Sequence, residues 1–321
     1  MYHQVATVPC DPWQLAVSPE NFDSHLTILK KHFQVVSLEE MITNLKKLPL
    51  GRRMVAITFD DGFKDNFDNA APVLQKHKLP TTFFIATGLI GTNNMFWWDA
   101  LLHIFLATEK LPGTLQINIS GRDFNYALDT EALLSDTARQ QINGWNHERP
   151  IPNKRVDLYF KIWEQLKALT MNERDKIITE LKQWAGGDYS SPAFSGVMNI
   201  DQLQQLNNNP LFRIGAHTVN HPALALQSET EQAFELNESK RVLQGWLMKS
   251  VKSVAYPYGN YNAVTLSLAT AAGFKIGVST EEKLAERGSK LLEMPRYQVK
   301  NWEAREFHDN LSDWFVKKLN P

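Results

Sequence analysis

The sequence has little that would tie it to a membrane, a nucleic acid or an oxidising compartment. Cys10 is the only cysteine among 321 residues, which excludes an intrachain disulfide and a thiolate metal cluster. The formal net charge of -1 offers no basic surface of the kind that nucleic-acid binding requires. No run of about 18 apolar residues occurs, so we expect no transmembrane helix.

The first residues, MYHQVATVPCDPW, lack a basic start followed by an apolar stretch, so no signal peptide is visible. Together with the single cysteine, this favours a reducing compartment, and we expect a cytoplasmic protein. The alternative is a periplasmic or cell-envelope protein whose start has been trimmed, because MYHQV resembles a strand already under way. The sequence gives no indication of the oligomeric state.

What the sequence does contain is a regular alternation of helix and strand patterns. Ser18 and Ser37 are typical helix N-caps, and they precede the predicted helices 19–31 and 38–48. The run MVAITF at 54–59 is continuously apolar, as in a strand buried on both faces. Further helices are predicted at 66–77, 201–210, 229–247 and 262–273, and further strands at 33–38, 81–87, 211–218, 251–259 and 274–280. This alternation predicts βαβ units and a parallel sheet.

The alternation stops between about Asn93 and Gly196, where the pattern is mostly helical and rich in tryptophan. We therefore expect one α/β domain over 1–321 that contains a helical insertion at 93–196. The stretch NNMFWWDALLHIFL in this insertion has two interpretations. Trp97 and Trp98 either pack inside the insertion or form an aromatic platform for a sugar ring.

Two short motifs follow strands and carry the residues best suited to chemistry. Asp60 and Asp61 end the apolar run 54–59, and His217 and His221 follow the strand 211–218. Asp-Gly is common turn chemistry, and surface histidines four apart are common as well. Taken together, however, one carboxylate and two imidazoles at strand ends make a three-ligand site with an open position, which is typical of a catalytic metal.

Three ordered motifs resemble those of the polysaccharide deacetylases, the NodB-homology or carbohydrate esterase family 4 group. They are TFDDG at 58–62, HTVNH at 217–221 and YPYG at 256–259, and the flanks YH and TTFFIATG are also similar. The resemblance covers residues 2 to about 299 apart from the insertion. It implies a distorted (β/α)7-type barrel and a metal-dependent hydrolase that removes N-acetyl groups from an amino-sugar glycan or glycan precursor.

The same resemblance implies a role for each matching residue. Asp60 is expected to be the general base, and the backbone N–H of Tyr258 is expected to bind the oxyanion. The expected ligands of a divalent metal, usually zinc with cobalt, nickel or manganese as alternatives, are Asp61, His217 and His221. Apart from what the resemblance implies, we expect an N-acetylated saccharide to contact Tyr256, Pro257, Trp97, Trp98 and His3.

The sequence departs from the family pattern in two places. Ala255 stands where the family often has an arginine that orients the base, and Arg296 stands where it often has a histidine acid. An arginine cannot donate a proton usefully at neutral pH. We expect Arg296 to pair with Asp60 as the missing arginine would, the alternative being a surface salt bridge. His3 and His308 are then the candidate acids, unless His3 is a satisfied core histidine.

The sequence is also compatible with two other functions. The scaffold could hydrolyse another amide or a cyclic imide. It could also serve a non-catalytic glycan-binding protein, an alternative that the missing arginine and missing acid favour and that the intact DDG and HTVNH motifs oppose.

Overall fold

The computed structural model describes residues 1–45, 53–187, 189 and 196–316. The chain forms two compact units. Unit 1 comprises Met1–Thr7, Leu15–Gly91 and Val197–Pro321, and unit 2 comprises Val8–Gln14 and Thr92–Gly196. No helix among the described residues is both long and apolar enough to cross a membrane.

Unit 1 is built on a curled, half-barrel sheet of five parallel strands in the order β11-β10-β9-β6-β5. The strands are β5 (Ile57–Phe59), β6 (Thr81–Ile85), β9 (Phe212–Ala216), β10 (Ser253–Ala255) and β11 (Ile276–Val278). Because all five run in one direction, the residues that follow them leave the sheet at the same edge. In parallel α/β folds this is the edge at which chemistry is placed.

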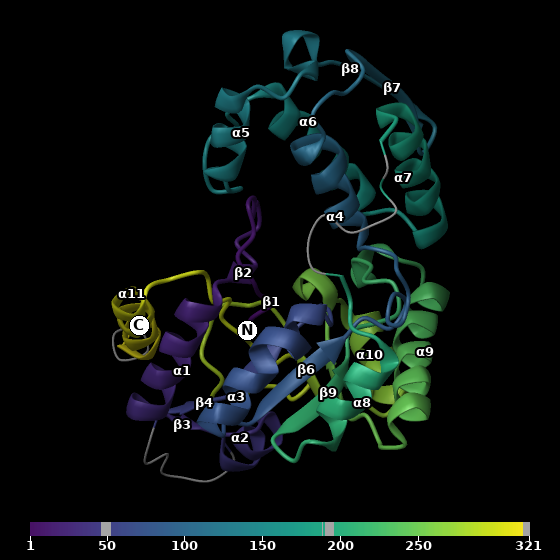
Figure 1. The fold of residues 1–321 in the computed structure, drawn as a ribbon. Coiled ribbons are helices and arrows are strands. Elements are labelled where there is room, and N and C mark those ends of the chain that lie inside the picture. The colour runs from purple at the N-terminus through teal and green to yellow at the C-terminus, as the bar shows by residue number, and fades with distance from the viewer. Residues whose placement is uncertain (46–52, 188, 190–195, 317–321) are drawn as a thin grey trace. The chain divides into compact units, whose positions relative to one another are not determined.

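Helices surround this sheet. They are α1 (Pro19–His32), α2 (Leu38–Leu45), α3 (Ala71–His77), α8 (Ile200–Asn208), α9 (Glu229–Leu247), α10 (Ala263–Ala271) and α11 (Ala304–Val316). Helices α8 and α9 pack against β9, and α10 packs against α9 (Figure 1). Both predicted serine caps are confirmed: Ser18 accepts from the Asn21 amide at 3.2 Å and Ser37 from the Glu40 amide at 3.1 Å. The predicted continuation of α2 to residue 48 lies outside the described residues.

The apolar run at 54–59, predicted as one strand, forms two short strands that belong to different sheets. It breaks at Ala56, so that β4 (Met54–Val55) pairs with β3 (Gln34–Val35) and only β5 joins the main sheet. A further two-stranded sheet joins β1 (Gln4–Val5) to β2 (Ala16–Val17).

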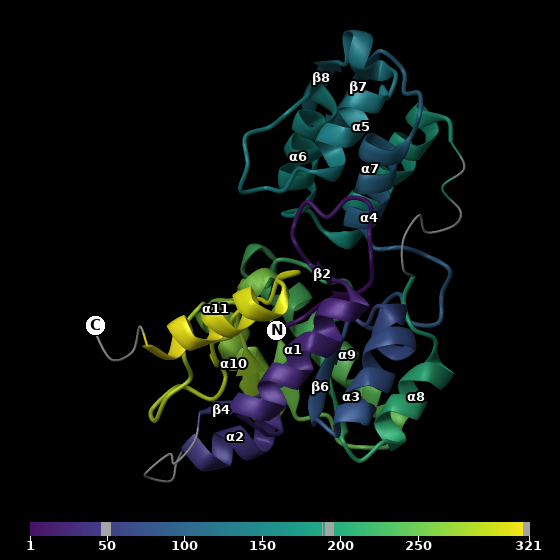
Figure 2. The ribbon, with the colours of Figure 1, turned by 60° about the vertical axis from the view of Figure 1, so that its left-hand side comes forward.

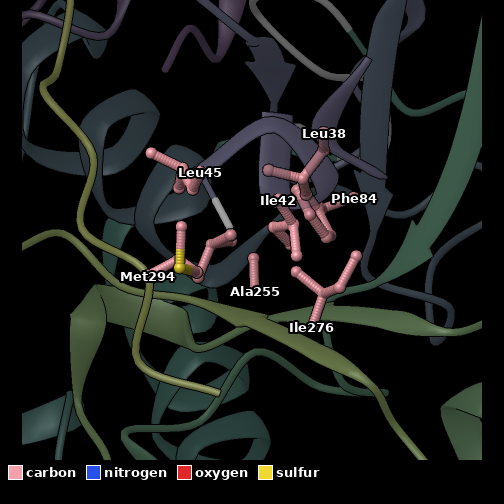
Figure 3. Packing of buried hydrophobic residues seen from close by; sticks show 8 residues of the cluster. Leu38, Ile42, Leu45, Phe84, Ala255, Ile276 and Met294 are labelled. Atoms are coloured by element: carbon pink, nitrogen blue, oxygen red, sulfur yellow. The ribbon is translucent and has the colours of Figure 1, made fainter. Parts of the chain in front are cut away.

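An apolar cluster packs α2 against the sheet (Figure 3). Its buried members are Leu38, Ile42, Leu45, Phe84, Ala255, Ile276, Val278 and Met294. The three α2 residues recur at helical spacing, which places them on one face of the helix. Burying each such aliphatic side chain contributes about 1.5–3 kcal/mol, so this cluster anchors α2 to the sheet.

Unit 2 is helical but also contains a hairpin that the sequence analysis missed. Its helices are α4 (Trp97–Leu102), α5 (Asp136–Asn143), α6 (Lys154–Leu166) and α7 (Met171–Ala185). Strands β7 (Thr114–Ile119) and β8 (Arg122–Ala127) pair antiparallel (Figure 2). Ser120 and Gly121 join them with φ values of 51° and 82°, which a two-residue hairpin turn requires. The alternation in TLQINI and the Ser-Gly pair were the available signals.

Candidate metal centre and catalytic site

Three side chains converge at the carboxyl edge of the sheet. Asp61 follows β5, whereas His217 and His221 follow β9, which lies two strands away in the sheet. The Nε2 atoms of His217 and His221 lie 3.4 and 3.3 Å from Oδ1 of Asp61. All three residues are buried, and together they could hold a metal ion.

The donor set fits a small divalent cation. Oδ1 of Asp61 is buried and, among the described residues, accepts no hydrogen bond of good geometry. Leaving a buried carboxylate oxygen without a partner is unfavourable unless a cation faces it. Ligand atoms bound at about 2.0–2.1 Å around a tetrahedral ion lie roughly 3.3–3.4 Å apart, which matches the two measured separations.

His217 is held in the tautomer that metal binding needs. Its Nδ1 lies 2.8 Å from the carbonyl oxygen of Ala255, at the end of β10, so we assign the N–H to Nδ1. The lone pair of Nε2 is then directed toward Asp61. A backbone carbonyl in this position is a common way of orienting a metal-binding imidazole.

The loops that carry the ligands hold unusual backbone conformations. Asp61, Thr218 and His221 have φ values of 75°, 65° and 52°, in the region that residues with a side chain rarely adopt. Each such residue costs on the order of 1 kcal/mol or more, so surrounding contacts must hold the loops in place. Strain of this kind clusters at functional sites.

The neighbouring carboxylate, Asp60, is gripped by Arg296. Nη1 and Nη2 of Arg296 donate to Oδ1 and Oδ2 of Asp60, each at 2.7 Å. Arg296 also donates to the carbonyl of Ser279 at 2.9 Å and to Oγ1 of Thr58 at 3.1 Å. The guanidinium is buried, so the expected pairing is confirmed and the surface salt bridge is wrong.

Charges within the site set the pKa values of its groups. Burial by itself would raise the pKa of Asp60, but the guanidinium of Arg296 and the imidazoles of His217 and His3 together lower that pKa below its ordinary value. Burial likewise opposes ionisation of Asp61, whose pKa is nevertheless lowered by the two facing imidazoles. Burial would lower the pKa of His217, and the carboxylates of Asp61 and Asp60 raise it instead. Both carboxylates are therefore anionic at neutral pH.

His3 lies near enough to this pair of carboxylates to interact with their charges, whereas His308 lies elsewhere. Burial lowers the pKa of His3 and the charges of Asp61 and Asp60 oppose that shift, which reports their proximity. The Nδ1 atom of His3 is buried without a hydrogen bond to any described residue, so His3 is not a satisfied core histidine. His308 is partly exposed on α11 beside His32.

In the YPYG turn, Tyr258 lies beside the candidate metal ligand His221, whereas Tyr256 and Pro257 are buried. Tyr258 has a φ of 58° and its ring meets that of His221 edge-on, with centroids 4.6 Å apart. Tyr256 and Pro257 are buried, and the ring of Tyr256 packs against Tyr261. Their side chains support the turn, and we do not include them among the proposed substrate contacts.

Trp97 and Trp98 are buried within unit 2, at 6% and 8% exposed. Trp98 stacks on Phe96 with centroids 4.4 Å apart, and Trp97 lies 5.8 Å from Trp163. Packing accounts for both indoles, which supports the first interpretation of NNMFWWDALLHIFL. We therefore do not place them in the proposed site.

Sequence reasoning missed the residues that support the site. Thr58 and Ser279 orient Arg296, and Ala255 orients His217 through its carbonyl. Thr58 stands in the TFDDG motif and could have been suspected. Contacts through backbone carbonyls leave no signal in a sequence, because every residue has one.

Comparison with known proteins agrees with this geometry. A model of the family described as polysaccharide deacetylase matches residues 47–111 and 182–277, leaving unmatched a stretch that lies within unit 2. A poly-beta-1,6-N-acetyl-D-glucosamine N-deacetylase of Staphylococcus aureus is 24% identical over 304 residues, covering 92% of this chain and 73% of the relative.

Two solved structures share the fold. One is the deacetylase PplD of Streptococcus pyogenes in complex with acetate, with a TM-score of 0.54, 23% identity, and coverage of 98% of this chain and 95% of that one. The other is IcaB from Ammonifex degensii, with a TM-score of 0.60, 17% identity, and coverage of 98% and 94%. The family model spans both ligand motifs and half of the sequence, and the chain therefore belongs to the polysaccharide deacetylase family.

Proposed function

We propose that this protein is a metal-dependent hydrolase that removes N-acetyl groups from an amino-sugar glycan or glycan precursor. The observation that carries the proposal is a buried ligand cluster of Asp61, His217 and His221 beside a carboxylate, Asp60, whose two oxygens are fixed by Arg296. A carboxylate that is not needed as a ligand is available to move a proton.

The metal, when bound, would lower the pKa of a water molecule and polarise the acetyl carbonyl. Zinc is the first candidate, because one carboxylate and two imidazoles with an open position suit it, and cobalt, nickel or manganese are alternatives. Asp60 accepts the proton that the attacking water loses. Its lowered pKa keeps it ionised, and Arg296 holds it in one rotamer.

Two further residues complete the proposed reaction. The backbone N–H of Tyr258, in the turn after β10, stabilises the negative charge that develops on the carbonyl oxygen. His3 is our candidate for donating a proton to the departing sugar amine, because it interacts with the charges of both carboxylates. Its test is the loss of acetate release in His3→Gln with metal content unchanged. Full activity in that variant would remove His3 from the reaction.

The substrate is proposed from the relatives. The Staphylococcus aureus relative is a poly-beta-1,6-N-acetyl-D-glucosamine N-deacetylase, which makes N-acetylglucosamine oligomers the first substrates to test. Arg296 also weakens the case for a non-catalytic glycan-binding protein, because the base has the arginine that Ala255 cannot supply.

An acetate-release screen tests the function. The zinc-loaded protein would be incubated with β-1,6- and β-1,4-linked N-acetylglucosamine oligomers, and the parent compared with Asp60→Asn. Asp68→Asn is the matched control, because Asp68 is an exposed aspartate paired with Lys64. We expect acetate from the parent and control only. Metal binding without acetate from any oligomer would instead favour a different amide or a binding role.

We infer in addition that the half-barrel sheet continues into a distorted barrel of about seven strands, as in parallel barrels of this type. The Tyr2 amide donates to the carbonyl of Thr58 at 2.8 Å, and the Met294 amide donates to that of Gly277 at 2.8 Å. The Val299 amide donates to Met1 at 2.9 Å, which joins the two added segments. Hydrogen exchange at the Tyr2 and Val299 amides as fast as in exposed loops would argue against closure.

A further inference from the structure

A buried carboxylate on α9 holds the loop between the two histidines. Oε2 of Glu235 accepts the backbone amides of Val219 and Asn220, at 2.7 and 2.9 Å. Oε1 of the same residue accepts from the side-chain amide of Asn220 at 2.7 Å. Glu235 is only 5% exposed, and it stands 14 residues beyond the second histidine of the motif, His221.

The backbone conformation of the loop that Glu235 holds is disfavoured by intrinsic φ/ψ preferences, so contacts with other residues must stabilise it. Thr218 and His221 both have positive φ, and Glu235 binds the two residues between them. The other side of the loop is closed by Gly88, whose amide donates to the carbonyl of Val219 at 2.8 Å. A Cβ on Gly88 would lie 2.8 Å from that carbonyl oxygen, so no larger residue fits without displacing the loop.

We propose that Glu235 is the positioning residue of the metal centre and sets its metal affinity by fixing the loop from His217 to His221. The inference rests on the proposed function, because it requires that these histidines bind a metal. Glu235 accepts hydrogen bonds from Val219 and Asn220, the residues between the two histidines, so we assign its effect on the metal to the conformation of the loop. Groups that orient metal ligands in this way typically change metal affinity about 10–100-fold when they are replaced.

The donor pattern explains why a carboxylate is needed. All three hydrogen bonds described here are accepted by Glu235, and hydrogen bonds to a charged acceptor are stronger than neutral ones. Glutamine has the same shape, but it is neutral and one of its two terminal atoms is a donor, so it cannot accept all three hydrogen bonds. If Asn220 is changed to aspartate in the same chain, the glutamine N–H at position 235 can donate to the new carboxylate at position 220. The two side chains can therefore be exchanged as a pair.

Zinc affinity, measured by competition with a chromophoric chelator, tests the proposal on full-length protein. We expect Glu235→Gln and Asn220→Asp each to weaken zinc binding about 10-fold or more. The double variant E235Q/N220D should recover most of that loss, because the introduced glutamine amide would donate to the introduced carboxylate. Glu238→Gln is the matched control, since Glu238 lies on the same helix and pairs with Arg241 at the surface.

Circular dichroism of the metal-free proteins separates positioning from folding. Weaker zinc binding by a folded E235Q, with recovery in E235Q/N220D, supports the proposal. Parent-like zinc affinity in E235Q overturns it, and so does a loss that the exchange fails to recover. If the parent binds no zinc, nickel, cobalt or manganese, the proposed metal centre itself is wrong. If the parent binds metal but E235Q binds it equally well, only the role of Glu235 is wrong.

Discussion

Arg296 and Asp60 form a two-pronged ion pair in which each nitrogen–oxygen distance is 2.7 Å, although 235 residues of sequence lie between them. Asp60 leaves the sheet after β5, and Arg296 approaches it from the segment that follows Met294, which bridges to β11. The pair joins the two edges of the sheet directly beside the candidate metal ligands. The Asp60 carboxylate is thereby fixed and kept ionised.

We predict that the two parallel hydrogen bonds of the Arg296 guanidinium contribute more to turnover than its positive charge does. Arg296→Lys keeps a cation beside Asp60 but cannot make two parallel hydrogen bonds. We expect turnover to fall about 10–100-fold, or roughly 1.5–3 kcal/mol in the activation barrier, with metal content unchanged. Steady-state acetate release measures this, with Arg305→Lys as control because the Arg305 side chain is 95% exposed. Equal turnover in the two variants would contradict the prediction.

Asp60 is predicted to act as a base and not as a required ligand. Asp60→Asn removes the proton acceptor but leaves Asp61, His217 and His221 unchanged. We expect metal content close to the parent value and a loss of turnover of about 100-fold or more. Elemental analysis and acetate release on the same preparation measure both quantities. Metal loss as complete as in Asp61→Asn would mean that the two aspartates share ligand duty.

The ligand assignment makes a prediction about metal content alone. His217→Ala and Asp61→Asn each remove one of the three ligands, and with two left we expect the bound metal to fall far below one ion per chain after dialysis. His308→Ala serves as the control, because His308 lies partly exposed on α11, outside the ligand cluster. The ligand set would be disproved if the His217 and His308 variants retained equal metal.

His25 is predicted to make folding stability depend on pH. Its ring stacks on Phe307, and its Nε2 donates to the carbonyl of Trp302 at 2.7 Å. Burial lowers its pKa from 6.5 to about 4, so the unfolded chain takes up a proton at a pH where the folded protein does not. Stability therefore falls as the pH drops from about 6.5 to about 4, by about 3 kcal/mol from this group.

Urea unfolding at several pH values measures that dependence. We expect His25→Asn to lose stability overall but to show a flatter profile between pH 6.5 and 4 than the parent. Thr27→Asn, which replaces an exposed, non-titratable residue of the same helix, should keep the slope of the parent. A profile for His25→Asn that runs parallel to that of the parent would show that other groups carry the dependence.

The sequence by itself determined the alternating elements and the ligand residues. Ser18 and Ser37 marked helix starts through local capping, and α9 was predicted with the bounds that the structure shows. The DDG and HTVNH motifs pointed to the candidate ligands because parallel strands bring their carboxyl ends to one edge. The caps and α9 could be predicted because they depend on residues that are neighbours in the chain, whereas the candidate ligand set required the parallel strand order and the family resemblance as well.

The tertiary structure decided what depends on distant contacts. The run at 54–59 divides between two sheets because β4 has β3 as a partner, and no local pattern announces that partner. The sequence favoured packing over a sugar platform for Trp97 and Trp98, and their ring contacts support packing. The pairing of Arg296 could be suspected from the need to hold a base, but only the fold closes the 235-residue separation. The three hydrogen bonds of Glu235 left no trace in sequence, because two of their donors are backbone amides, which every residue except proline possesses.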